Sequence, residues 1–426
     1  MLREDGRYQT YLQILKEELV PAMGCTEPIA IAYGAAKARE LLGIIPDRVL
    51  VEVSANIIKN VKSVIVPNTN GLKGIKAAAS VGIIAGMPEK ILEVISQVSE
   101  EEKKLTKEYM DRDCIEVKLA DNDCIFDIIV TMYNKQSYVK LRIANYHTNI
   151  IYIEKNGEVI YETGTIEAKE VGLTDRGLLN VKDIIDFADS VDIEEVREVL
   201  TRQIEYNSAI AREGIENNFG ANIGSVLLKT YGNDVKTRAK AMAAAASDAR
   251  MSGCELPVVI NSGSGNQGIT ASLPVIEFAK ELEVPEDKLY RALVVSNLIT
   301  IHQKTGIGRL SAFCGAVCAG CGSGAGIAYL HGGGYEEISH TLVNAVAIVS
   351  GIICDGAKPS CAAKIATAVD AGILGYFMFQ EGQQFLGGDG IVAKGVENTI
   401  TNMGYLGKVG MKETDKEIIN IMMNKC

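Results

Sequence analysis

The chain has 426 residues, of which 47% are hydrophobic and 23% charged, so it can bury a large core and is long enough for two domains. Its formal net charge of −11 argues against a nucleic-acid partner, because phosphate binding requires clustered lysine and arginine. Residues 1–7 carry mixed charges and no apolar segment, so we expect no secretory signal and a cytoplasmic protein.

The first part of the chain changes from helical to extended periodicity. Residues 9–47 repeat apolar side chains at helical spacing, which predicts helices there, including one over 28–42. From residue 48 apolar and polar residues alternate, and further helices are expected near 71–84 and 88–110. Successive antiparallel strands are predicted over 115–119, 124–133, 137–144, 149–154 and 158–163.

Helical patterns return after residue 167 and include 237–249, 341–353 and 362–380. We therefore predict an α+β fold in which residues 1–47 and 167–426 form a mostly helical, discontinuous catalytic domain. Residues 48–166 form an inserted α+β domain with an antiparallel sheet. This arrangement would bring Cys25 next to Cys354.

One uncharged stretch, 310–335, is long enough to span a bilayer. It is dominated by Gly, Ala, Ser and Cys, and the mean hydropathy of the chain is only +0.11. We therefore predict a buried helix pair and no membrane association.

The ten cysteines of a chain without a secretion signal point to metal binding rather than to disulfides. Cys314, Cys354 and Cys361 lie beside glycines or at helix starts near the C-terminus. Cys318 and Cys321 add a Cys-x-x-Cys unit, but they lie about one helical turn apart, so at most part of the trio with Cys314 can face one site. The cysteines at 114, 124 and 254 are interpreted as small buried apolar residues.

Three segments place backbone N–H groups at a helix start. Thr26 is a good N-cap, so Cys25 should precede a helix whose positive end favours the thiolate. Residues 355–361 form a turn that opens a helix with Cys361 in its first turn, and the glycine-rich loop 261–268 precedes another helix. These starts suit a carboxylate substrate and an anionic cluster, although glycine also serves tight helix packing.

Several motifs, in order along the chain, resemble the L-cysteine desulfidase family, which is related to the α domain of iron–sulfur L-serine dehydratases. They are Gly24-Cys25-Thr26-Glu27-Pro28, Asn68-Thr69-Asn70-Gly71-Leu72-Lys73-Gly74, Gly265-Asn266-Gln267-Gly268, Ser311-Ala312-Phe313-Cys314-Gly315, and Ile353-Cys354-Asp355-Gly356-Ala357-Lys358 with Cys361.

The resemblance implies a [4Fe-4S] cluster, no pyridoxal phosphate, and conversion of L-cysteine to pyruvate, ammonia and hydrogen sulfide. Cys314, Cys354 and Cys361 would hold three irons and leave the fourth open as a Lewis acid. Cys25 would be the base that removes the α-proton, with ligation of the cluster as its rival role. A final thiol, Cys426, is a hypothetical cap on the fourth iron.

Charge matching assigns substrate binding to polar residues and glycine of two loops, and it adds Lys304 and Lys358 to the catalytic set because they could offset the negative charge of the cluster or the carboxylate. Lys73 is a weaker candidate, because a solvated surface lysine is the more ordinary interpretation. The substrate-binding residues are Asn68, Thr69, Asn70, Gly265, Asn266 and Gln267, of which the first three could equally form only a turn.

Two other functions stay open. The same architecture would serve an L-serine dehydratase, because hydroxide can leave from an iron much as sulfide does. A non-catalytic iron–sulfur or zinc protein is the third interpretation, and it requires a closed site with four protein ligands. In each catalytic case the partner is a small amino-acid substrate, and a homo-oligomer is left open.

Overall fold

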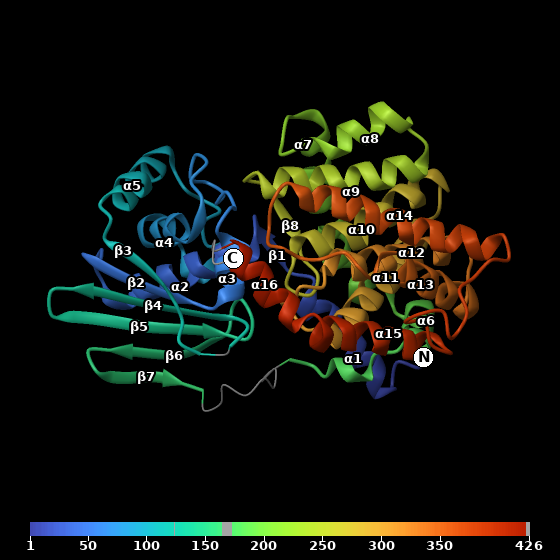
Figure 1. The fold of residues 1–426 in the computed structure, drawn as a ribbon, viewed down its shortest axis with the longest axis horizontal. Helices are drawn as coiled ribbons and strands as arrows, with labels where there is room; N and C mark the ends of the chain where they lie inside the picture. The colour runs from blue at the N-terminus through green and yellow to red at the C-terminus, as the bar shows by residue number, and fades with distance from the viewer. Residues whose placement is uncertain (123, 164–172, 423–426) are drawn as a thin grey trace.

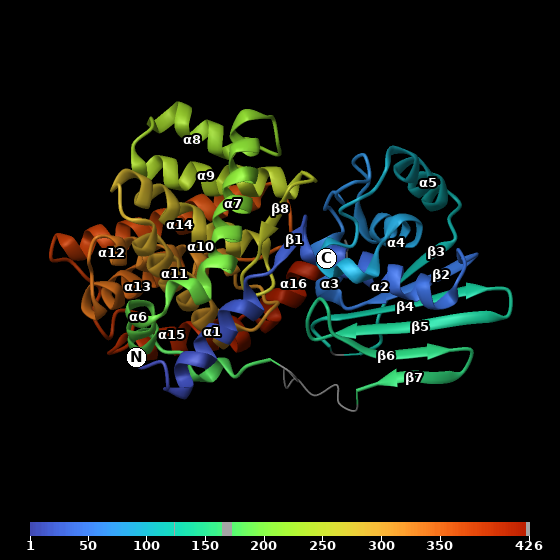
Figure 2. The same cartoon turned by 180° about the vertical axis from the view of Figure 1, so that it is seen from behind.

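The computed structural model describes residues 1–122, 124–163 and 173–422. It has two lobes, one built on a twisted sheet and one almost entirely helical (Figure 1), and the view from behind shows the same division (Figure 2). This confirms the predicted mostly helical α+β fold class. The predicted boundary at 166/167 and Cys426 lie outside the described residues.

The sheet lobe contains the alternating sequences. Its strands lie in the order β3-β2-β4-β5-β6-β7. Neighbours are antiparallel except β2 and β3, which run parallel, so the expectation that residues 115–119 form an antiparallel strand is wrong. The elements are α2 (Thr26–Leu42), β2 (Arg48–Val53), α3 (Ala55–Val61), α4 (Gly74–Ala85), η1 (Pro88–Glu93), α5 (Glu100–Asp111), β3 (Ile115–Leu119), β4 (Asp127–Asn134), β5 (Ser137–Ala144), β6 (Ile150–Lys155) and β7 (Glu158–Glu162).

Helices α2 and α4 pack side by side over one face of this sheet (Figure 1). The sequence predicted that residues 1–47 belong to the helical domain. In the structure, however, α2 belongs to the sheet lobe, and its Gly34 lies directly over β4 and β5. A Cβ added at Gly34 would lie 3.2 Å from Ile143 Cδ1 and 3.7 Å from Val130 Cγ2. Cys25, which precedes α2, therefore sits where the chain crosses between the lobes.

The helix expected over 88–110 is two elements, η1 and α5. Ile91 has a φ of 52°, which a helix cannot contain. Helix α5 then starts afresh at a capping box, in which Ser99 accepts from the Glu102 N–H and the Glu102 carboxylate accepts from the Ser99 N–H. Local turn chemistry thus divides a segment whose composition favours helix throughout.

The helical lobe is formed by the N-terminal helix and by the chain from residue 176 onward. Its elements are α1 (Gly6–Glu18), β1 (Pro21–Met23), η2 (Arg176–Leu178), α6 (Val181–Ser190), α7 (Ile193–Glu216), α8 (Ile223–Tyr231), α9 (Val235–Met251), β8 (Pro257–Val259), α10 (Gly265–Glu281), α11 (Glu286–Ile307), α12 (Gly315–Leu330), α13 (Tyr335–Val349), α14 (Ser360–Gln380), α15 (Val396–Tyr405), η3 (Leu406–Gly410) and α16 (Lys412–Met422).

Residues 310–335 form the single buried helix α12 and its flanking turns rather than a helix pair. The helix ends before Gly332, whose φ of 87° suits glycine. Glycines let α12 approach α14 closely: a Cβ on Gly372 would lie 2.2 Å from the Gly320 oxygen. Cys314 and Cys361, at the starts of these two helices, are therefore fixed by the same tight packing.

Within the described residues, one helix, α14, is long and apolar enough to cross a membrane. However, 56% of the most apolar 18-residue stretch of this helix is buried, and α9, α12 and α13 all pack against the helix. Its apolar character is thus accounted for by its place in the bundle.

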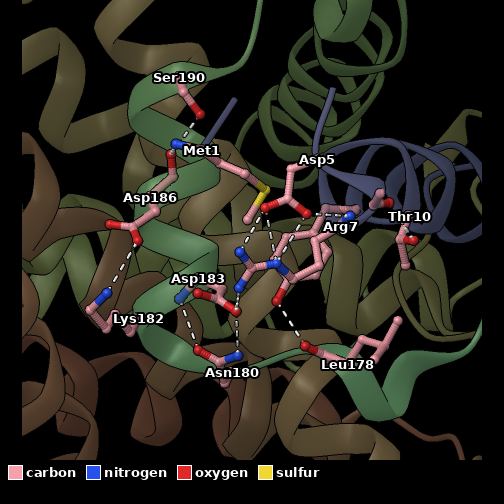
Figure 3. Close-up of polar contacts among 12 residues, drawn as sticks. Met1, Asp5, Arg7, Thr10, Leu178, Asn180, Lys182, Asp183, Asp186 and Ser190 are labelled. Carbon is pink, nitrogen blue, oxygen red and sulfur yellow. Dashed lines mark hydrogen bonds and ion pairs between the residues drawn. The ribbon is translucent and has the colours of Figure 1, made fainter. Parts of the chain in front are cut away.

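The N-terminal segment is tied to α6 by polar contacts (Figure 3). The Met1 amino group donates to the Asp186 oxygen at 3.2 Å, and Arg7 Nη1 pairs with Asp183 Oδ2 at 2.8 Å. Arg7 also pairs with Asp5, the N-cap of α1. These contacts hold α1 in the helical lobe and so fix where β1 begins.

Candidate functional site

A short strand pair, which the sequence did not predict, sets the position of Cys25. Strands β1 and β8 are antiparallel, with Pro21 opposite Val259 and Met23 opposite Pro257. The residues after β1 lead to Cys25, and those after β8 form the glycine-rich loop before α10. The two segments meet where Thr26 Oγ1 donates to the Gly263 oxygen at 2.9 Å.

Cys25 is itself the N-cap of α2 and is only 1% exposed. Its Sγ lies 3.8 Å from Met251 Sδ, and it packs in one small apolar cluster with Val64, Met251 and Cys361. Burial raises the pKa of the thiol to about 12, although the positive charge of Arg250 opposes this. The expectation that the helix start keeps Cys25 as a thiolate is therefore wrong, because desolvation outweighs it.

Cys314 and Cys354 lie on two segments that pair like short strands. Phe313 and Ile353 form an antiparallel bridge, the Cys314 N–H donates to the Ile352 oxygen at 3.1 Å, and the Cys354 N–H donates to the Ala312 oxygen at 2.6 Å. Burial, and then the neighbouring Cys354 thiol, raise the pKa of Cys314 to about 12. These two thiols are thus held close together by backbone hydrogen bonds.

Cys361 occupies the first turn of α14, as predicted, with its N–H donating to the Lys358 oxygen at 3.0 Å. Its Sγ lies 3.6 Å from the Gly356 oxygen. Burial and the Cys354 thiol raise its pKa as well. The structure therefore brings Cys314, Cys354 and Cys361 into one neighbourhood, with Cys25 beside Cys361.

Among the described residues, no three or more His, Cys, Asp or Glu side chains are gathered closely enough to hold a metal ion. A single ion would need its thiolates around one point, whereas in a cluster each thiolate binds a different iron and the sulfurs stand further apart. The soft thiol donors of Cys314, Cys354 and Cys361 are of the kind that hold iron–sulfur clusters.

The two candidate lysines differ in their surroundings. Lys304 is 5% exposed, and burial lowers its pKa, while the nearby thiols Cys318, Cys354 and Cys314 oppose that shift. Lys358 is half-buried, pairs with Asp355 and donates to the Gly356 oxygen at 3.1 Å. Lys304 is thus a buried amine beside the cysteines, whereas Lys358 stabilises the turn that carries them. Lys73 is exposed.

The glycine-rich loop contacts the surroundings of both Cys25 and Cys314. Asn266 Nδ2 lies 3.8 Å from Met251 Sδ, on the side of Cys25. Gln267 is 4% exposed and lies against Gly315, where an added Cβ would be 2.6 Å from the Gln267 Cδ. The predicted Asn266 and Gln267 therefore span from Cys25 to the helix start beside Cys314.

The second predicted loop uses its side chains for its own turn. Asn68 Nδ2 donates to the Ile95 oxygen at 2.7 Å, Thr69 Oγ1 donates to the Val66 oxygen at 2.7 Å, and Asn70 is exposed. The loop still borders the site, because a Cβ on Gly24 would lie 2.3 Å from the Pro67 Cγ. A substrate-binding role for residues 68–70 stays a prediction.

Cys318 and Cys321 are fully buried within α12. Cys318 lies near Lys304, and burial raises the pKa of both thiols. Their surroundings are those of core residues.

Sequence reasoning missed His147, Glu27 and Arg309, which meet where the lobes touch. His147, between β5 and β6, is 5% exposed, and its Nε2 lies 4.0 Å from Glu27 Oε1. Burial lowers its pKa to about 4. A Cβ on Gly263 would lie 3.0 Å from Arg309 Nη1 and 3.2 Å from His147 Cε1. Only tertiary packing reveals this group, since its members come from separate elements.

Lys59 of α3 is a second missed residue and links three parts of the chain. Its Nζ lies 2.5 Å from Asp415 Oδ1 of α16 and 3.5 Å from the Cys354 oxygen, and its side chain is 1% exposed. The segment carrying Cys354 is therefore braced by the sheet lobe and by the C-terminal helix.

Comparison with known proteins places the chain among bacterial relatives. The profile of the serine dehydratase alpha chain family matches residues 89–420. A UPF0597 protein of Desulfitobacterium hafniense (strain Y51) is 75% identical over 426 residues, which cover 100% of this chain and 99% of the relative. A UPF0597 protein of Lachnoclostridium phytofermentans is 55% identical, covering 98% and 100%, and one of Treponema denticola is 48% identical, covering 99% and 100%.

Proposed function

Since this chain belongs to the serine dehydratase alpha chain family, we propose that it is a cytoplasmic iron–sulfur lyase that converts L-cysteine to pyruvate, ammonia and hydrogen sulfide. The observation that carries the proposal is the convergence of four thiols from three separate segments, with Cys25 buried beside Cys361 and Cys314 beside Cys354. The motif blocks that resemble L-cysteine desulfidases support cysteine as the substrate.

Cys314, Cys354 and Cys361 are the residues that would hold a [4Fe-4S] cluster. When bound, a cluster with one open iron supplies a Lewis acid that helps the sulfur of the substrate to leave. Lys304 places a buried amine beside these thiols, and Lys364, which pairs with Asp355 and donates to the Ile353 oxygen at 2.8 Å, also lies near them. No pyridoxal phosphate is required.

Cys25 is the proposed base. It takes the proton from Cα while the Cβ–S bond breaks and its electron pair leaves with sulfide, which gives 2-aminoacrylate. Tautomerisation and hydrolysis then yield pyruvate and ammonia. Because burial raises the thiol pKa to about 12, the thiolate is scarce at neutral pH but strongly basic when it forms. Direct ligation of the cluster is the rival role.

The loop at the start of α10 would hold the rest of the substrate. Its backbone N–H groups lie at the positive end of a 17-residue helix, which favours a carboxylate. Gln267 Oε1 is buried without a hydrogen-bond partner among the described residues and is available to an ammonium group.

L-serine dehydration is the second candidate, and the family match over residues 89–420 is the observation that favours it. The chemistry differs only in the leaving group. Hydroxide is a poorer leaving group than sulfide, so the same site would depend more strongly on its Lewis acid.

The test is anaerobic reconstitution with iron and sulfide, removal of excess sulfide, and assay of products from L-cysteine and from L-serine. Equal amounts of sulfide and pyruvate from L-cysteine, dependent on iron, support the proposal. Pyruvate from L-serine alone would move the assignment to the second candidate. No product from either amino acid, despite an intact cluster, would refute both and favour a non-catalytic protein.

A further inference from the structure

Arg250, in the last turn of α9, is a buried cation with few partners. It is 3% exposed, its Nη1 donates to Asn266 Oδ1 at 3.1 Å, and its Nε has no hydrogen-bond partner among the described residues. Within the part of the chain that the structure describes, no carboxylate lies at ion-pair distance from it. A buried charge is strongly unfavourable unless an opposite charge or further hydrogen bonds compensate it.

Two other arginines, the buried Arg176 and the half-buried Arg142, have their charge compensated by carboxylates. Arg176 pairs with Glu17 at 2.7 Å and with Glu18 at 2.9 Å. Arg142 pairs with Asp127 at 2.8 Å. Arg250 differs from both, because its hydrogen-bond partner is a neutral amide.

The position of Arg250 joins it to the site. The next residue, Met251, has its Sδ 3.8 Å from both Cys25 Sγ and Asn266 Nδ2. Burial dominates the pKa of Cys25, and the positive charge of Arg250 lowers it. The guanidinium also lies tightly against the loop, since a Cβ on Gly265 would be 2.3 Å from Arg250 Nε. Only glycine at 265 allows this arrangement.

The loop then continues toward the cysteines. Asn266 contacts Arg250, and its neighbour Gln267 lies against Gly315, next to Cys314. Arg250 is therefore linked to the proposed cluster ligands in two ways: through residues 265–267, and through Cys25, which packs with both Met251 and Cys361. An amino acid with its thiol toward the cysteines would direct its carboxylate toward Arg250.

We propose that Arg250 binds the α-carboxylate of the amino-acid substrate, together with the N-terminus of α10. The planar guanidinium matches a carboxylate, and the helix start adds N–H donors and a favourable dipole. This role rests on the proposed function and makes Arg250 the residue that selects α-amino acids over thiols without a carboxylate.

The experiment compares two thiols that differ in the group of interest. 3-Mercaptopropionate carries a carboxylate and no amine, whereas 2-mercaptoethylamine carries an amine and no carboxylate. Binding of each to the anaerobically reconstituted protein is measured by calorimetry for wild type, Arg250→Gln, Arg250→Lys and the control Arg238→Gln. Arg238 lies in the same helix but pairs with Glu281 at 2.6 Å and Glu277 at 3.1 Å, away from the loop.

In Arg250→Gln, the Kd of 3-mercaptopropionate should rise about tenfold to hundredfold, as expected for a lost charge-assisted hydrogen bond, while the Kd of 2-mercaptoethylamine stays the same. For Arg250→Lys, the Kd of 3-mercaptopropionate should lie between those of wild type and Arg250→Gln, because lysine keeps the positive charge but cannot donate two parallel hydrogen bonds to the carboxylate. Arg238→Gln should change neither.

Unchanged binding of 3-mercaptopropionate by Arg250→Gln, or its absence in wild type, would overturn the proposal. Equal weakening of both thiols would also overturn it, because that result shows a packing role. The binding test and the product assay can fail independently. If wild type turns over neither cysteine nor serine, the proposed function is refuted. The difference between the Kd values of the two thiols still decides the role of Arg250.

Discussion

His147→Gln should remove an acid sensitivity that the folded protein owes to one buried imidazole. Burial is the largest cause that lowers the pKa of His147 to about 4 from its ordinary value of 6.5. Glu27 opposes this shift, whereas the charges of Arg309 and Arg250 reinforce it. The neutral imidazole is therefore the form that the interface between the lobes accepts.

These pKa values give both the direction and the magnitude of the change in unfolding free energy with pH. Between pH 6.5 and about 4 the unfolded chain binds a proton that the folded protein does not, so stability is present above pH 6.5 and is lost as the pH falls. At about 1.4 kcal/mol per pH unit between the two pKa values, the loss is about 2 kcal/mol at pH 5 and reaches about 3 kcal/mol below pH 4.

The assay is urea unfolding at about pH 7.5 and about pH 5, followed by circular dichroism, for wild type, His147→Gln and His340→Gln. His340 is the matched control, since it stacks on Phe379 in the helical lobe with ring centroids 4.9 Å apart. Wild type and the control should lose more stability on acidification than His147→Gln, by about 2 kcal/mol. Equal losses of stability on acidification in all three proteins would show that His147 is not the source of the acid sensitivity.

Three further predictions concern the elements that hold the site. Gly372→Ala should destabilise the protein by about 1–3 kcal/mol in urea unfolding and reduce iron uptake, because its Cβ would meet the Gly320 oxygen at 2.2 Å. Lys59→Met should cost about 1–2 kcal/mol by removing the ion pair between α3 and the half-buried Asp415 carboxylate, and limited proteolysis should then cleave α16 faster than in wild type. If Cys25 is the base, kcat/KM for L-cysteine should rise with pH through the alkaline range, because the thiolate fraction grows toward a pKa of about 12; a flat profile would contradict that role.

Much of the fold is visible in the sequence where periodicity is strong. The alternation of Val49, Val51 and Val53 correctly predicts β2, and the turn at Asn156 joins β6 to β7 as expected. The side-chain pattern of α2 does not indicate to which lobe the helix belongs, because its residues are mostly small and apolar and the helix is buried on nearly all sides. Strands β1 and β8 were missed because three residues give no periodicity.

Some residues of the candidate site could likewise be identified from the sequence, and others could not. Cys314 and Cys361 could be placed at helix starts from local signals such as Pro359 and the glycines around them. Arg250 and His147 could not, because their importance comes from burial and from partners more than ten residues away in the chain. The pKa of Cys25 was misjudged for the same reason: a helix start is readable from sequence, but the depth of burial that outweighs it is not.

In the proposed mechanism two neighbouring thiols have different roles: Cys361 holds a cluster and Cys25 moves a proton. The most direct measurement is the iron and sulfide content of anaerobically reconstituted Cys25→Ser and Cys361→Ser, with turnover of L-cysteine measured on the same samples and Cys114→Ser as control. We expect that Cys25→Ser keeps the iron content of wild type but loses turnover, that Cys361→Ser loses both, and that Cys114→Ser keeps both. Loss of iron in Cys25→Ser, or a full cluster in Cys361→Ser, would contradict it.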